Sequence, residues 1–456
     1  MKAFLALGFT TLLLAASPPA SAEQAQPLPT PTCAWQFEWT PFGLGNWLWA
    51  DTANRWWYMP IDAEWQELKI TGTYPKARFF SLAVYDNAPV STGIADHLFD
   101  AQIVPDPGSI NPFAMPPPGR CSSSATRHPG RCNPPAAPDQ AYTVTIVRGK
   151  KTNDNVLKLN ADTGWFLYRL YLPNATEGSM GGVPLPEVSI TYQDGKTTQL
   201  PICPIFNRQS ELVPLQAQIV PVQLEYPLDP EEDLEVPPVP DHIWFGAVKD
   251  PPPVLLPNPD QKYLVSFFMP EYESDRVIVI RGKMPAYPDT YNGRPVSQPA
   301  KGFKAVQLRY WGACLGELVS PLPVIGCATD ARMPLDRHGF YTIVISNDVL
   351  RPDWLPQRAV WLPWGDETNV PKLIFMRNLL ASDDFSQSVQ EAIKRGCWFD
   401  LQFPTPPTQD AIMGAGQCAQ GVMGDYYPEA VWCDRKTFIK GGWRACFHAA
   451  DVPVRP

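Results

Sequence analysis

Proline density is the feature of this sequence that most limits its fold. The 456-residue chain contains 54 prolines, together with 16 tryptophans and 16 tyrosines. Proline fixes φ at about −65° and has no amide hydrogen to donate, so it interrupts helices and the interiors of sheets. A mainly helical protein is therefore excluded, and we expect a mainly β protein of short strands joined by rigid loops. Hydrophobic residues make up 45% of the chain, which indicates packed cores rather than disorder.

The first residues have the layout of a secretory signal peptide. Lys2 precedes a short apolar run from Phe4 to Ala16, and Ala20-Ser21-Ala22 offers small residues for cleavage. We therefore expect residues 1–22 to be removed and the mature protein to be secreted or periplasmic. The apolar run is shorter than the ~20 residues that span a bilayer, and no later stretch is long enough, so no transmembrane segment is predicted in the mature chain.

Ten cysteines lie beyond the predicted cleavage site, and no Cys-x-x-Cys motif occurs. An even number of cysteines in an exported chain predicts disulfides rather than a metal or redox site. Proximity favours the pairs Cys33–Cys203, Cys121–Cys132, Cys314–Cys327, Cys397–Cys418 and Cys433–Cys446. Other connectivities remain open, because a sequence does not determine pairing.

A proline-rich segment over residues 206–260 divides the chain into two halves. It contains Pro251-Pro252-Pro253 and the acidic run Asp229-Pro230-Glu231-Glu232-Asp233, a composition typical of an extended linker. We expect one domain over residues 33–205 and a second over 261–456, which ends in an irregular tail held by disulfides.

The two halves carry similar strand patterns in the same order. Three pairs of segments match: Arg78–Asp86 with Lys304–Trp311, Tyr142–Val147 with Tyr341–Ser346, and Phe166–Leu172 with Leu373–Leu380. Arg169 and Arg377 occupy similar positions in the last pair. These segments predict an internal duplication in which each half is a β-sandwich of the jelly-roll type. In the first half, Asp194-Gly195 predicts a hairpin turn.

One short helix is predicted over residues 383–394. Ser382 and the aspartates after it resemble a helix N-terminus, Phe385, Val389 and Ile393 follow at helical spacing, and Gly396 lies just beyond the end.

Most reaction-specific motifs are absent from the sequence. There is no Gly-x-Ser-x-Gly elbow, no phosphate-binding glycine loop and no His-Glu-x-x-His motif. With only 5 histidines and no close cysteine pairs, neither a metal nor another cofactor is predicted. The net charge of −9 gives no basic surface for nucleic acid.

A small set of polar residues next to the matched strands could form a catalytic site. The candidates are Asp86, His97, Arg309, Asp336 and His338. An aspartate can orient an imidazole as a general base, and two convergent acids among Asp86, Asp96, Asp100 and Glu317 would suit glycoside hydrolysis. The alternative is that these residues belong to turns and solvated loops.

Tryptophans crowd the start of the mature chain. Exposed aromatic faces bind sugar rings or apolar ligands, whereas buried aromatic side chains would fill the cores of the sandwiches, and both produce this pattern. The candidate binding residues are Trp47, Trp49, Trp56, Trp57 and Trp311.

The sequence resembles a group of uncharacterised exported bacterial proteins with paired β-sandwich or jelly-roll-like domains of unknown function. The segments that carry the resemblance are Arg78–Asp86, Gly181–Val188, Trp361–Gly365, Met376–Leu380 and Met423–Pro428. It implies export and a β fold, and it identifies no functional residue.

Two functions fit these observations. The first is a protein that binds a glycan or an apolar small molecule, or that has a structural role in the envelope. The alternative is a secreted hydrolase or lyase that acts on an extracellular polymer or a small ester.

Overall fold

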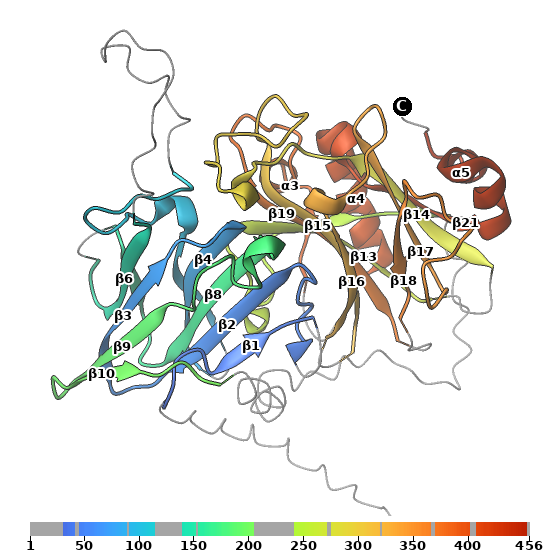
Figure 1. Ribbon diagram of the computed structural model, residues 1–456. Coiled ribbons are helices and arrows are strands. Elements are labelled where there is room, and N and C mark those ends of the chain that lie inside the picture. Colours follow the sequence, from blue (N-terminus) through green and yellow to red (C-terminus); the bar gives the residue numbers. More distant parts are fainter. Residues whose placement is uncertain are drawn as a thin grey trace, which may run out of the picture.

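The protein is mainly β, as the proline content predicts. The computed structural model describes residues 31–41, 45–88, 91–114, 139–151, 154–204, 241–270, 275–319, 322–365, 370–401 and 407–453. Its strands form four sheets, two from each half of the chain, and the halves lie side by side (Figure 1). None of the sheets contains strands from both halves.

The first half is a sandwich of two five-stranded sheets. One sheet has the order β1 (Phe37–Trp39), β2 (Asn54–Ile61), β8 (Gly164–Pro173), β4 (Ala77–Asp86) and β5 (Gly93–Phe99). The other has the order β10 (Thr197–Leu200), β9 (Glu187–Tyr192), β3 (Trp65–Thr73), β6 (Ala141–Arg148) and β7 (Val156–Leu159). The β9–β10 hairpin turns at Asp194-Gly195, where Gly195 has a φ of 82°, as its sequence predicts.

The second half has the same design with additions at its edges. One sheet has the order β16 (Val324–Thr329), β15 (Leu308–Glu317), β19 (Lys372–Ala381), β13 (Gln261–Phe268), β12 (Gly246–Val248) and β20 (Trp398–Phe399). The other has the order β11 (His242–Ile243), β21 (Glu429–Asp434), β14 (Arg276–Lys283), β17 (Phe340–Ser346) and β18 (Val360–Pro363).

The strand orders show the internal repeat directly. In the facing sheets, the order β12, β13, β19, β15, β16 of the second half is equivalent to the order β1, β2, β8, β4, β5 of the first. In the other two sheets, the order β21, β14, β17, β18 is equivalent to β9, β3, β6, β7. Both halves also include a parallel final pair, β6 with β7 and β17 with β18.

The register corrects one detail of the predicted repeat. Arg169 on β8 lies opposite Ser81 on β4, and Arg377 on β19 lies opposite Gly312 on β15. Ser81 and Gly312 are therefore equivalent, and Arg78 and Arg309, which lie three residues before them, are equivalent as well. The matching segment begins near Leu308 rather than Lys304, because residues 304–307 precede β15.

A shared core joins the two halves. The sheet that contains β8 and the sheet that contains β19 face each other, and side chains from both form one buried cluster that includes Tyr58, Trp165, Tyr310 and Phe375. Each half also has its own core between its two sheets. Because β4, β8, β15 and β19 are covered on both faces, they are buried along almost their whole length, whereas β6 alternates between buried and half-buried residues.

The predicted helix is shorter than expected, and two further helices are present. Helix α3 (Val389–Lys394) begins after Ser388, whose side chain accepts a hydrogen bond from the backbone N–H of Glu391. The predicted start at Ser382 is therefore wrong, since Ser388 provides the N-cap. The predicted irregular tail is also wrong, because it contains α4 (Gln409–Met423), β21 and α5 (Arg435–Ala449), which is kinked at Gly442.

Four disulfides have the pairings that proximity predicted. They are Cys33–Cys203, Cys314–Cys327, Cys397–Cys418 and Cys433–Cys446. The predicted Cys121–Cys132 pair lies outside the described residues. Four bridges are typical of a protein that folds in an oxidising, exported environment.

The predicted linker is described only over its last part. Residues 241–260 contain β11, β12 and a 3₁₀ turn at Pro253–Leu255, and both strands pair within the second half. These residues therefore belong structurally to the second sandwich. Among the described residues, no helix has the length and apolar character needed to cross a membrane.

Candidate functional site

Two buried ion pairs connect the halves in a reciprocal arrangement. Arg78 of the first half bonds Asp330 of the second at 2.7 Å, and Arg309 of the second bonds Asp100 of the first at 2.7 Å. Asp100 also accepts a hydrogen bond from the backbone N–H of Phe80, two residues after Arg78. In the same way, Asp330 accepts one from the backbone N–H of Trp311, two residues after Arg309. The repeat thus places the same contact twice across the junction.

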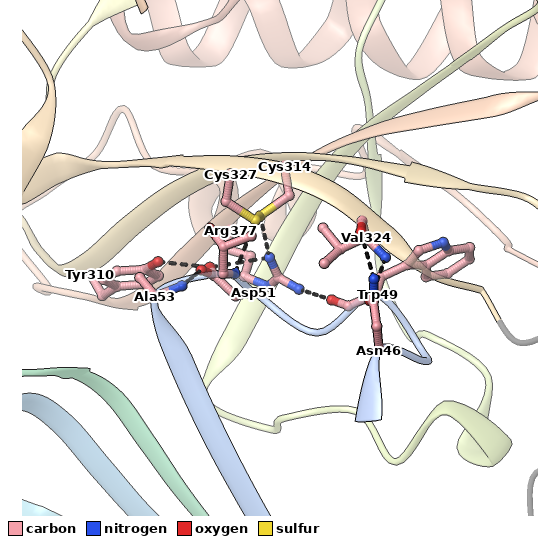
Figure 2. Close-up of a disulfide and its surroundings, with 10 residues drawn as sticks. Asn46, Trp49, Asp51, Ala53, Tyr310, Cys314, Val324, Cys327 and Arg377 are labelled. Atoms are coloured by element: carbon pink, nitrogen blue, oxygen red, sulfur yellow. Dashed lines mark hydrogen bonds and ion pairs between the residues drawn. A yellow bond between two sulfur atoms is a disulfide. The ribbon is translucent and has the colours of Figure 1, made fainter. Parts of the chain in front are cut away.

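A third buried ion pair lies at the disulfide between β15 and β16. Arg377 on β19 reaches from the second half to Asp51 of the first at 3.2 Å, and it also donates to Sγ of Cys314 and to the backbone carbonyl of Trp49 (Figure 2). The hydroxyl of Tyr310 donates to the same Asp51 oxygen at 2.7 Å.

Three residues of this group lie close enough together to resemble a metal site. Asp51 and the sulfur atoms of Cys314 and Cys327 offer ligand atoms within 4.8 Å of one another. The two sulfurs are bonded to each other, and thiolates rather than disulfide sulfurs bind metals. Asp51 also already pairs with Arg377. The arrangement is therefore a structural contact of the junction.

Arg169 occupies the position in β8 that Arg377 occupies in β19. It donates from Nη2 to the hydroxyl of Tyr85 at 2.6 Å and to the backbone carbonyl of Leu256, which belongs to the other half, at 2.7 Å. Its Nη1 is buried and has no hydrogen-bond partner. Within the described residues, no carboxylate oxygen lies within 4.0 Å of this guanidinium.

An apolar cavity lies between the halves beside these two arginines. It has about 70 Å³ of space open to the centre of a water molecule, and about 650 Å³ of space without atoms when its open mouth is included. Arg169 and Arg377 contribute to its wall, which is otherwise mainly aromatic and aliphatic and includes Trp39, Trp49, Trp56, Tyr171, Leu256, Tyr263, Val265, Leu373 and Phe375.

Burial dominates the electrostatics of the junction. Desolvation raises the pKa of Asp100 to about 6, although Arg309 opposes this effect, and it also raises the pKa of Asp330 against the effect of Arg78. Burial raises the pKa of Tyr85 to about 12, and it raises the pKa of Tyr263 as well. The tyrosine hydroxyls beside the cavity are therefore neutral donors and acceptors near neutral pH.

The predicted catalytic residues of the first half lie on neighbouring strands, Asp86 at the end of β4 and His97 on β5, and they bond different partners. Asp86 accepts hydrogen bonds from the backbone of Asn160 and Ala161, which fixes the loop before β8. His97 Nε2 lies 3.1 Å from Asp260, so its aspartate partner comes from the other half rather than from the adjacent Asp96. Neither residue lines the apolar cavity.

The candidates of the second half lie in two separate places. Arg309 is buried in its ion pair with Asp100 at the junction. Asp336 and His338 share the turn before β17, where Asp336 pairs with Arg281 and accepts the backbone N–H of His338. The structure therefore does not bring the five candidates together at the cavity.

Three of the four acids considered for glycoside hydrolysis are bound to a cation, and the fourth, Asp86, accepts hydrogen bonds from Asn160 and Ala161. Asp96 pairs with Lys151, Asp100 with Arg309, and Glu317 with Lys372. These contacts account for the carboxylates without a catalytic role.

All five candidate tryptophans are buried. Trp47, Trp57 and Trp311 belong to the cores and do not form an exposed face. Trp49 and Trp56 are 7% and 8% exposed, and both contribute to the wall of the cavity. Only these two therefore have a position suited to contact with a ligand.

The repeated arginines are visible in the sequence, but their partners are not. Asp51 and Asn258 lie in loops and Asp330 begins a 3₁₀ turn, and each meets its partner from the other half. The signal available in the sequence was the repeated Arg169 and Arg377 themselves, since an arginine within an apolar strand needs a buried partner.

Comparisons with known proteins place the chain beside uncharacterised bacterial structures. No family model matches it, and no curated protein does. An uncharacterised protein from Burkholderia cenocepacia has 12% identity and a TM-score of 0.46, over 77% of this chain and 80% of that one. A structural genomics target from Vibrio parahaemolyticus has 10% identity and a TM-score of 0.35, over 74% of this chain and 86% of that one.

Proposed function

We propose that this chain is an exported binding protein that holds a small apolar ligand in the cavity between its two β-sandwiches. The cavity itself carries the proposal. It lies at the junction of two repeated units, and its wall is mainly aromatic and aliphatic with a few polar groups. Ligand sites commonly have this composition and lie at such interfaces.

The cavity favours a slim apolar ligand over a glycan. Its volume of about 70 Å³ open to the centre of a water molecule accommodates only a few water molecules, so a narrow chain fits better than a sugar ring. The hydroxyls of a sugar would also lose water hydrogen bonds without regaining them on such a wall. The tryptophans that would form an exposed sugar platform are buried.

Export to the periplasm or the cell exterior is part of this proposal. The signal-like residues 1–22 support it, and so do the four disulfides. The alternative function as a secreted hydrolase or lyase has less support, because its candidate residues do not meet at the cavity.

The test is a titration of the mature chain with n-alkanols from butanol to octanol. Isothermal titration calorimetry and the shift in melting temperature both report binding, because a ligand that binds only the folded state raises its stability. We expect saturable binding with an optimum chain length, since the volume of the cavity limits how much of the alkanol chain it can hold.

A variant that fills the cavity makes the test specific. Val265→Phe adds a ring at a side chain that lines the cavity and is 3% exposed, and Val349→Phe makes the same change at a position that is 84% exposed. We expect Val265→Phe to weaken alkanol binding by roughly tenfold or more and Val349→Phe to retain it. The absence of saturable binding by any alkanol, or equal binding by a folded Val265→Phe protein, would overturn the proposal.

A further inference from the structure

Arg169 is the exception among four buried arginines at the junction of the halves. Arg78, Arg309 and Arg377 each pair with an aspartate from the opposite half, at 2.7, 2.7 and 3.2 Å. Arg169 is only 2% exposed, yet it bonds no carboxylate. Its partners are one hydroxyl and one backbone carbonyl.

The repeat identifies the missing partner. Asp51 lies three residues before β2, and Asn258 lies three residues before β13, the equivalent strand. The two side chains also bond in the same way, each accepting the backbone N–H two residues later. Two residues earlier, Trp49 and Leu256 both have a positive φ, of 54° and 47°, and their carbonyls bind Arg377 and Arg169 respectively. Asn258 therefore stands where the first half has the carboxylate that neutralises Arg377.

This substitution leaves a buried positive charge at the wall of an apolar cavity. Burying an unpaired cation is costly, and the free Nη1 of Arg169 lacks even a neutral acceptor. The other acid of the segment, Asp260, has one carboxylate oxygen 3.1 Å from His97 and the other buried without a hydrogen-bond partner, and neither lies within 4.0 Å of the Arg169 guanidinium. An anion bound in the cavity would supply the charge that Asp51 supplies to Arg377.

A hydroxyl beside Arg169 can add a second hydrogen bond. Tyr171 lines the cavity, and its oxygen accepts a hydrogen bond from Nδ2 of Asn258 at 2.9 Å. Its own proton can therefore point to a ligand oxygen. Guanidinium together with hydroxyl donors matches the planar, two-oxygen geometry of a carboxylate.

We propose that the ligand is an amphipathic monocarboxylate, with its carboxylate at Arg169 and its apolar chain against the aromatic wall. This inference rests on the proposed function, because it assigns the chemical class of the ligand for the same cavity. A carboxylic acid with a short alkyl chain has the charge and the slim shape that the site requires.

Three ligands of equal length separate this inference from the proposed function. Hexanoate, 1-hexanol and hexanamide are titrated against the mature chain at pH 7.5, and the readout is the affinity of hexanoate relative to each neutral ligand. We expect hexanoate to bind at least roughly tenfold more tightly, as a hydrogen-bonded charge pair does compared with a neutral one. Equal affinities would overturn the carboxylate assignment while supporting the apolar cavity, and the absence of binding by all three would overturn both.

Two variants test the role of Arg169 itself. Arg169→Met keeps the apolar stem without the charge, and Asn258→Asp supplies internally the carboxylate that the first half has at Asp51. We expect each variant to reduce the hexanoate preference to about onefold, and we expect Asn258→Asp also to raise the melting temperature of the unliganded protein. Val349→Phe serves as the control that keeps the wild-type preference. A hexanoate preference that survives in folded Asn258→Asp protein would contradict the assignment.

Discussion

Removing one carboxylate from the junction should destabilise the protein far more than removing a similar carboxylate from its surface. Asp330→Asn leaves Arg78 buried without a counter-charge, because the side chains of Arg78 and Asp330 are 2% and 0% exposed. The pair Lys76–Glu177 has a comparable distance of 2.6 Å, but its side chains are 52% and 37% exposed. Glu177→Gln is therefore the matched control.

The expected magnitudes follow from burial. Breaking a buried ion pair by removing one partner costs about 3–5 kcal/mol, since the remaining charge stays desolvated. The ring of Tyr287, 4.4 Å from the Arg78 guanidinium, favours the lower part of that range because it partly stabilises the cation. Glu177→Gln should cost less than about 1 kcal/mol, as exposed pairs do. The double variant Arg78→Met/Asp330→Leu should recover most of the loss, because it removes both buried charges.

The assay is urea unfolding followed by tryptophan fluorescence at pH 7.5, with the disulfides intact. We expect the first transition of Asp330→Asn to move to lower urea, because Arg78 loses its counter-charge. If Asp330→Asn lies within about 1 kcal/mol of Glu177→Gln, the reciprocal ion pairs do not hold the halves together and the reasoning fails.

Three further predictions concern local features. Gly282→Ala should lower the free energy of unfolding by about 1–3 kcal/mol, because the new Cβ would lie 2.6 Å from the hydroxyl of Tyr341. Gly421→Ala in α4 places its Cβ with no atom within 4 Å and should be neutral or stabilising. Thermal melts compare the two variants. Ser388→Ala should cost about 1 kcal/mol through loss of the α3 N-cap, and an unchanged urea midpoint would contradict this. The Asp100 carboxyl should titrate near pH 6 in carbon-detected NMR. Since its folded pKa exceeds the usual value of 3.8, its ionisation makes the protein less stable as the pH rises from about 4 to 6. A titration midpoint below pH 4 would refute this prediction.

The sequence was most informative where local chemistry decides the structure. Alternating segments such as Tyr142–Val147 became strands, Asp194-Gly195 became a hairpin turn, and three cysteine pairs 13 to 21 residues apart became disulfides. It was least informative in the tail, where α4 and α5 went unnoticed. The glycines within both helices and the aromatic residues within α5 weaken a helical pattern that packing on the sheets still stabilises.

The site depended on contacts that no local pattern reveals. Trp49 and Trp56 were named for their residue type, and the structure shows that both line the cavity; Trp47, of the same type and close in sequence, lies in the core. All three belong to the shared core between the halves, and which of them borders the cavity depends on how the halves pack, which sequence periodicity does not show.

For this protein, composition and short-range pattern determined the β architecture and its repetition, because proline geometry, side-chain alternation and turn residues act within a few positions of the chain. Tertiary structure decided that the two sandwiches face each other and that their junction encloses an apolar cavity. It also decided which charges meet there: Arg377 finds the carboxylate of Asp51, while Arg169 finds the hydroxyl of Tyr85 and the backbone carbonyl of Leu256, 87 positions later in the sequence. Charges buried between distant segments depend on the packing of whole sheets, so their partners appear only once the sheets are in place.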